Sequence, residues 1–206
     1  MILPNQLTVL RIALTPAFIV FLLFGNGPYN LIIASGIFAI AALTDLYDGM
    51  IARKYGTVSR WGAFVDPLAD KILLSTAFFG LVMLGYLKLW MVLAVIFRDA
   101  VITGVRAYGL RKNKHIKTEK FAKWKTTFQI SLISLILIYE NLIHNPFGKS
   151  LKIEYQNIVD QSGIFYAAML FIVFITMYSG ISYLIGNRRF VKQMAVRIYR
   201  TILNSQ

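Results

Sequence analysis

Four aspartates stand close together in a chain that otherwise contains few acids. Asp45, Asp48, Asp66 and Asp70 are four of only nine acidic residues among 206. The first two are three residues apart and the last two are four apart, so each pair shares one face of a helix. Two carboxylates ~4 Å apart repel by roughly 4 kcal/mol at an effective dielectric near 20. Such a cluster needs cations, and its hard oxygen ligands favour Mg²⁺ or Mn²⁺ together with a phosphate-bearing substrate.

The residues that follow the first pair suit a phosphate-bearing ligand. Gly49 and Ala52 lie on or beside the helix face of Asp45 and Asp48, where small side chains let a bulky ligand approach the backbone. Arg53 adds a planar donor that matches a phosphate group. The stretch therefore indicates a metal and phosphate site.

Taken singly, these residues also have structural explanations. Asp66 before Pro67 fits a helix N-cap followed by proline at the first helical position. Asp45 fits a hydrogen-bonded helix end, and Arg53 fits an anchor at a membrane surface. The occurrence of all of them in one short stretch favours the chemical explanation.

The composition indicates an all-α polytopic membrane protein. The chain is 57% hydrophobic and 15% charged, with a mean hydropathy of +0.62. A soluble domain of this size could not bury so much apolar surface. The chain has no cysteine, which excludes disulfides and thiolate metal ligands. The N-terminus has no basic region followed by a cleavage site, so we expect the first apolar segment to be retained.

Six apolar segments with helical periodicity are long enough to span a bilayer. We expect transmembrane helices at residues 7–24, 29–51, 66–86, 89–110, 124–143 and 164–185. The connections alternate in charge, and lysine and arginine concentrate on one side, which places both termini and the aspartates in the cytoplasm. With no repeat or linker visible, we expect one domain over 1–206, in the bacterial inner or plasma membrane, with an active-site cavity on the cytoplasmic side. The net charge of +13 follows from this bias and from anionic substrates, so membrane lipids and not nucleic acid are the expected partners.

The acidic stretch resembles the signature of the CDP-alcohol phosphatidyltransferase family, with every spacing matched. It reads Asp45–x2–Asp48–Gly49–x2–Ala52–Arg53–x8–Gly62–x3–Asp66–x3–Asp70. The resemblance implies an enzyme with two divalent ions, Mg²⁺ or Mn²⁺, that works as a homodimer. The implied metal ligands are Asp45, Asp48, Asp66 and Asp70, and Asp70 is also the implied catalytic base for the acceptor hydroxyl. The implied contacts to the CDP moiety are Asn5, Thr8, Gly49, Arg53 and Gly62.

Three further runs narrow the resemblance to family members that act on glycerol phosphate. They are Pro4–Asn5–x–Leu7–Thr8–x2–Arg11, Asp66–Pro67–Leu68–Ala69–Asp70–Lys71 and Lys123–x–Lys125–Thr126–x2–Gln129. The implied reaction transfers the phosphatidyl group of CDP-diacylglycerol to sn-glycerol 3-phosphate and releases CMP. Two positions depart from the family pattern, since Asp99 stands in place of glutamate and Ala122 in place of glycine. Another acceptor, inositol phosphate or phosphatidylglycerol, is the alternative within the family, and an ion or proton transporter is the alternative outside it.

The cations of the later segments are candidates for binding the acceptor phosphate. Lys123 and Lys125 lie where the fifth segment enters the bilayer, and Arg106 lies at the cytoplasmic end of the fourth. Arg98 and Asp99 lie about eight residues inward from Arg106, hence ~12 Å deeper at about 1.5 Å per residue. Charges at that depth indicate either an internal cavity or an interhelical ion pair, and the sequence leaves both open.

Overall fold

In the computed structural model, the described residues form mainly long helices. The description covers residues 3–25, 27, 29–55, 62–111, 121–144, 163–188, 190–194 and 196, without the side chains of 3–7, 45–55, 62–68, 70, 110–111 and 121–123. The helices are α1 (Leu3–Leu23), α2 (Asn30–Tyr55), α3 (Gly62–Met83), α4 (Leu89–Arg111), α5 (Phe121–His144) and α7 (Ile164–Gly186). The prediction of an all-α fold is confirmed, and each expected segment is a helix.

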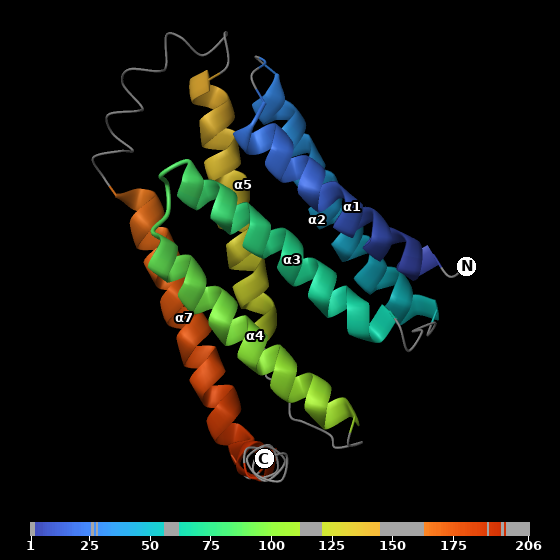
Figure 1. Cartoon of the computed structure of the whole chain (residues 1–206). Coiled ribbons are helices and arrows are strands. Elements are labelled where there is room, and N and C mark those ends of the chain that lie inside the picture. The colour runs from blue at the N-terminus through green and yellow to red at the C-terminus, as the bar shows by residue number, and fades with distance from the viewer. Residues whose placement is uncertain are drawn as a thin grey trace, which may run out of the picture.

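The helices form two groups that pack together (Figure 1). In the first helix group, α1 packs against α2 and α3, and in the second, α7 packs against α4 and α5. The groups meet where α3 contacts α4 and α5, and where α2 contacts α5. Any residue on α3 that reaches α4 therefore connects the two groups.

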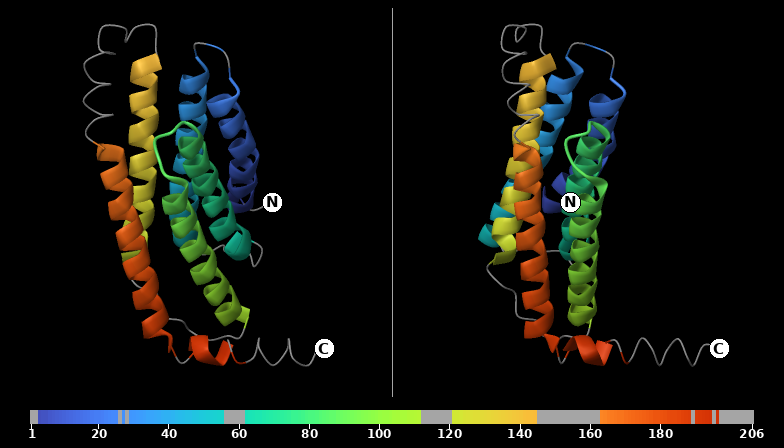
Figure 2. Two further views of the ribbon diagram at one scale, coloured as in Figure 1. Left: turned by 60° about the vertical axis from the view of Figure 1, so that its left-hand side comes forward. Right: turned by 90° about the vertical axis from the view of Figure 1, so that its left-hand side faces the viewer.

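Helices that follow one another among those described run in opposite directions, so beginnings and ends of helices alternate at each end of the bundle (Figure 2). One end holds the beginnings of α1, α3 and α5 and the final turns of α2, α4 and α7. Residues 190–194 are helical and turn away from the axis of α7 at this end. Phe190, Val191 and Met194 pack there against Ile102 and Tyr183.

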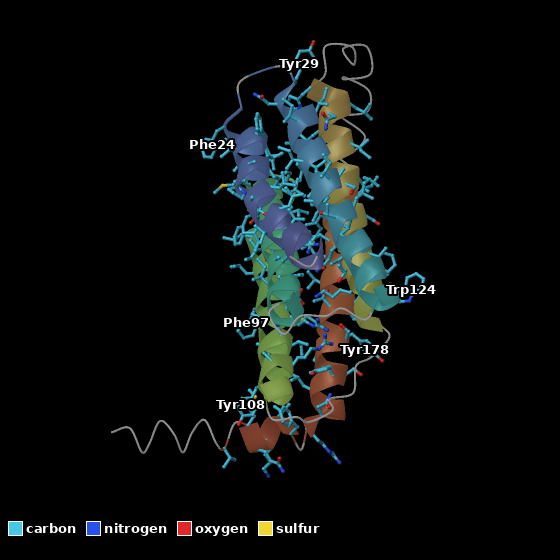
Figure 3. The ribbon with its side chains drawn as sticks, turned by 90° about the vertical axis from the view of Figure 1, so that its right-hand side faces the viewer. Phe24, Tyr29, Phe97, Tyr108, Trp124 and Tyr178 are labelled. Atoms are coloured by element: carbon cyan, nitrogen blue, oxygen red, sulfur yellow. The ribbon has the colours of Figure 1, made fainter. Side chains whose placement is uncertain are left out.

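The interior between the helices is apolar and the outer surface is apolar as well. Buried aliphatic and aromatic side chains from α1 to α5 and from α7 form one core, which includes Phe18, Phe38, Phe78, Met91, Ile136 and Met169. The rings of Phe18 and Phe38 pack with centroids 5.6 Å apart. Large side chains also project outward, among them Phe97, Trp124 and Tyr178, each at least 65% exposed (Figure 3). An outer surface of this kind suits a lipid environment.

Two of the described helices have the length and apolar composition needed to cross a membrane. They are the stretches Trp124–His144 in α5 and Ile164–Gly186 in α7. Shorter apolar helical stretches lie in α1, α2 and α3, at Thr8–Leu23, Asn30–Thr44 and Lys71–Met83.

Gly80 allows α1 and α3 to approach closely. A Cβ atom at this position would lie 2.6 Å from Leu22 Cδ2 and 3.0 Å from Ile19 Cδ1. Leu22 is itself buried, so it has little room to move away. Small residues have this role where helices pack within a bilayer.

We predict that Gly80→Val destabilises the protein by about 1–3 kcal/mol, because the added side chain overpacks the contact between α1 and α3. Thermal unfolding of the purified protein in detergent measures the effect. Gly36→Val on α2 is the matched control, since a Cβ there meets no atom within 4 Å. Equal stability of the Gly80→Val and Gly36→Val variants would contradict the prediction.

Candidate active site

The four aspartates lie in helices that reach the same end of the bundle. Asp45 and Asp48 lie in the later part of α2, and Asp66 and Asp70 lie near the beginning of α3 (Figure 2). Helix α3 begins at Gly62, four residues earlier than expected, so Asp66 is inside the helix and is not its N-cap. The backbone thus brings both acidic pairs to one end.

The side chains of these aspartates lie outside the described part, so their role as metal ligands stays a prediction. The side chains of Asn5, Arg53 and Lys123 also lie outside the described part, so the binding roles expected for them and for Gly49 and Gly62 stay predictions. Among the side chains that are described, no group of three or more His, Cys, Asp or Glu residues is placed to hold a metal ion. Thr8, an expected contact of the CDP moiety, is buried near the beginning of α1.

A polar cluster lies where the two helix groups meet. It draws on α3, α4, α5 and α7, and we call it the Asp99 cluster: Lys71, Arg98, Asp99, Thr103, Lys125 and Ser179. Each member is buried or partly buried. Polar groups this far from water need partners, and the cluster supplies most of them, although Arg98 Nε is buried without a hydrogen-bond partner.

Asp99 forms ion pairs with two cations through one carboxylate oxygen. The Lys125 ammonium on α5 donates a hydrogen bond to Asp99 Oδ1. Arg98 Nη1 donates to the same oxygen at 3.1 Å. The pair with Lys125 joins α4 to α5, so of the two explanations left open for these deep charges, the interhelical ion pair is confirmed.

Arg98 also connects α4 to α7. Its Nη2 donates to Ser179 Oγ at 2.7 Å, and that hydroxyl donates in turn to the carbonyl of Thr176 at 3.1 Å. Gly180 leaves the space that the arginine occupies, because a Cβ there would lie 2.8 Å from Arg98 Nε and 2.9 Å from its Cγ. The close packing of α4 on α7 therefore depends on a small residue beside a buried cation.

Lys71 connects α3 to α4 and follows Asp70 directly in the chain. Its ammonium donates to the backbone carbonyl of Asp99 at 3.0 Å and to Thr103 Oγ1. The Thr103 hydroxyl donates to the same carbonyl at 2.7 Å. The rotation of α3 about its axis is thus fixed relative to α4 one residue after the expected catalytic base.

The three expected acceptor-binding cations differ in their surroundings. Lys125 is buried within the Asp99 cluster, whereas Arg106 is exposed on α4. Lys123 precedes Lys125 by two residues on α5. Lys125 lies beside the charged side chain of Asp99, and the side chain of Lys123 is outside the described part.

The sequence singled out Arg98, Asp99 and Lys125, but it gave no role to Lys71 or Ser179. A lysine followed by a long apolar run was a usable signal for Lys71, since such a charge needs a partner. Ser179 and Gly180 carried no such signal, because small residues are common in apolar helices.

A second polar group lies towards the opposite end of α5. Asn141 Nδ2 donates to Ser35 Oγ at 2.6 Å and so joins α5 to α2. Glu140 is buried and lies 2.6 Å from His144 Nδ1, one turn further along the helix. These contacts secure the helices far from the acidic pairs.

Comparisons with known proteins identify relatives of this chain. The family model described as CDP-alcohol phosphatidyltransferase matches residues 1–178. A probable phosphatidylglycerophosphate synthase of Mycobacterium tuberculosis is 38% identical over 138 residues, which are 66% of each chain.

Several other relatives carry the name CDP-diacylglycerol–glycerol-3-phosphate 3-phosphatidyltransferase. The protein of Cereibacter sphaeroides is 36% identical over 68% of this chain and 65% of its own. The protein of Bacillus subtilis is 35% identical over 71% of this chain and 83% of its own. The aligned regions thus span slightly less than two thirds of the Mycobacterium and Cereibacter proteins.

We predict that Gly180→Ala destabilises the protein by about 1–3 kcal/mol, because the new methyl group displaces the Arg98 side chain from Ser179. Thermal unfolding of the purified protein is the measurement. Gly186→Ala on the same helix serves as the control, since a Cβ there meets no atom within 4 Å. A Gly180→Ala protein as stable as the wild type would show that Arg98 adjusts without cost.

Proposed function

This chain belongs to the CDP-alcohol phosphatidyltransferase family, and from that premise we propose that it transfers the phosphatidyl group of CDP-diacylglycerol to sn-glycerol 3-phosphate. The products would be phosphatidylglycerophosphate and CMP. The observation that carries the proposal is the complete spacing of the acidic signature on α2 and α3, which reach the same end of the bundle. The choice of acceptor is supported by relatives whose names state this reaction.

We propose that α1 to α5 and α7 cross the membrane, with the acidic ends of α2 and α3 on the cytoplasmic side. The apolar outer surface and the apolar stretches within the helices support this arrangement. Arg53 and Lys54 stand in the last turn of α2 and a lysine-rich connection follows α4, and both helices end at the end of the bundle that holds the aspartates. CDP-diacylglycerol would then enter from the bilayer while the acceptor enters from the cytoplasm.

The donor set on α2 and α3 fits a divalent metal centre. Four carboxylates supply the hard oxygen ligands that Mg²⁺ and Mn²⁺ prefer, and without cations they would repel one another. We propose Asp45, Asp48, Asp66 and Asp70 as the residues that would hold two such ions. When bound, the ions would neutralise charge on the pyrophosphate of the donor.

The remaining chemistry falls to side chains of this chain. In the proposed reaction, Asp70 accepts the proton of an acceptor hydroxyl. The hydroxyl oxygen forms a bond to the phosphorus that carries the lipid, and the bond from that phosphorus to CMP breaks. Lys123, Lys125 and Arg106 would bind the acceptor phosphate, and Asn5, Thr8, Gly49, Arg53 and Gly62 would contact the CDP moiety. Binding by fixed groups lowers the barrier mainly through orientation.

An acceptor panel tests the proposed function. We expect CMP release from CDP-diacylglycerol by the purified protein with Mg²⁺ or Mn²⁺ and sn-glycerol 3-phosphate. Release should be at least about tenfold slower with inositol phosphate or phosphatidylglycerol, because interactions with the correct acceptor are made in the transition state. Faster release with either of these acceptors would reassign the alcohol, and proton or ion uptake by proteoliposomes without CMP release would reject the transferase.

We predict that Asp70→Asn lowers the turnover number by at least about a hundredfold, because general-base catalysis typically contributes that much. The amide keeps the size of the side chain, so the protein should remain folded and bind CDP-diacylglycerol. Single-turnover CMP release and equilibrium binding of the donor measure the two effects. Asp160→Asn, the same change between α5 and α7, is the control. Turnover near that of the wild type in Asp70→Asn would remove this residue from the base role.

A further inference from the structure

Asp99 holds two cations with one carboxylate in a place that water hardly reaches. The side chains of Lys125, Arg98 and Asp99 are 5%, 11% and 15% exposed. Both cations bind the same oxygen, Oδ1. The three side chains together therefore carry a net charge of +1 in a largely dry environment, and such an excess favours an anion beside them.

Of the two cations, Lys125 is the one close to a helix end at the end of the bundle that holds the acidic pairs. Arg98 is directed by Ser179 towards α7 and packs against Gly180. Lys125 lies only four residues after the beginning of α5, near the end of the bundle where the acidic helices end. An ammonium has three donors, so a hydrogen bond to Asp99 leaves capacity for a phosphate.

Because a lysine side chain is flexible, the carboxylate of Asp99 can aid ligand binding by holding the Lys125 ammonium in place. A lysine side chain has four rotatable bonds and loses roughly 2 kcal/mol of rotamer entropy when it is fixed. Asp99 fixes the ammonium of Lys125 before any ligand arrives, so the ligand does not have to order it.

Asp99 also accepts a hydrogen bond from α3, the helix that carries Asp66 and Asp70. The backbone carbonyl of Asp99 accepts hydrogen bonds from Lys71, which follows Asp70, and from Thr103. The position of the Lys125 ammonium and the rotation of α3 are thus both set at Asp99.

We propose that Asp99 is a positioning residue, which holds the ammonium of Lys125 where it binds the phosphate of the acceptor alcohol. This inference rests on the proposed function, because it concerns how that site binds its acceptor. Asp99 itself touches neither substrate.

The inference is tested by measuring the KM for the acceptor and the KM for the lipid donor separately in Asp99 variants. In Asp99→Asn, the KM for sn-glycerol 3-phosphate should rise by about tenfold or more, since a charged hydrogen bond contributes that much. The KM for CDP-diacylglycerol should stay within about twofold of the wild-type value, because this change leaves the CDP contacts in place. Asp99→Glu keeps the carboxylate and should recover most of the acceptor affinity.

A double-mutant cycle identifies the partner. Lys125→Met alone should raise the KM for the acceptor at least as much as Asp99→Asn. The double variant should be no worse than Lys125→Met, because Asp99 acts through that lysine. Additive effects of the two changes would overturn the inference.

Ser179→Ala provides the matched control within the cluster. It removes the contact between Arg98 and α7 without touching Lys125. Its acceptor KM should equal that of the wild type, and a rise as large as in Asp99→Asn would mean that the cluster is only structural. If Asp99→Asn does not fold, Lys125→Met decides, because Asp99 is proposed to act through that lysine. An acceptor KM of Lys125→Met within about twofold of the wild-type value would overturn the inference.

Failure of the proposed function has a different signature. It would appear in the wild-type protein as absent CMP release with sn-glycerol 3-phosphate. The comparison of wild type, Asp99→Asn and Lys125→Met then uses the phosphate-bearing acceptor that the panel identifies. Equal KM values for that acceptor in all three proteins would reject the role of Asp99.

Discussion

A carboxylate and two cations between apolar helices are stable only when each has a partner, and this requirement shapes the centre of the molecule. Asp99 pairs with Arg98 and Lys125, and its carbonyl accepts a hydrogen bond from Lys71. Removing one partner from such a group leaves a buried charge, which costs several kcal/mol. The helices that carry these residues cannot slide or rotate independently, so α3, α4, α5 and α7 are bound to one another at a single point.

The small residues of the bundle follow from the same requirement. A polar contact between side chains requires a suitable distance between the helix backbones. Gly180 on α7 leaves room for the Arg98 side chain of α4 and so allows that distance. Gly80 does the equivalent for an apolar contact between α1 and α3. Elsewhere the core is filled by large side chains such as Phe18, Phe38 and Phe78. At these two positions glycine allows close approach, while dispersion and burial stabilise the apolar core.

The sequence predicted the helices well because long apolar runs bounded by charged segments have few alternatives in a membrane protein. The errors lie at the polar ends. Helix α2 continues to Tyr55 and α3 begins at Gly62, beyond the apolar limits at 51 and 66. Helical hydrogen bonding thus extends past the last apolar residue at both of these ends. The partners of Asp99 were not predictable, since they depend on how far each helix rotates about its axis, and hydropathy does not encode that.

Charged groups lie at the junction of the two helix groups. This explains why Asp99, in the second helix group, can affect the transfer reaction proposed for the aspartates of the first. The acidic pairs belong to α2 and α3, whereas the candidate acceptor cations belong to α4 and α5. A transfer reaction requires donor and acceptor to meet at a distance of a few ångströms, so the two groups must keep a fixed relative position. Apolar packing alone tolerates sliding by a fraction of a turn. The hydrogen bonds of Lys71 to α4 and of Lys125 to Asp99 do not, because each fails within about 1 Å of its ideal length. The Asp99 cluster is therefore the feature that gives the junction of the two groups a definite geometry.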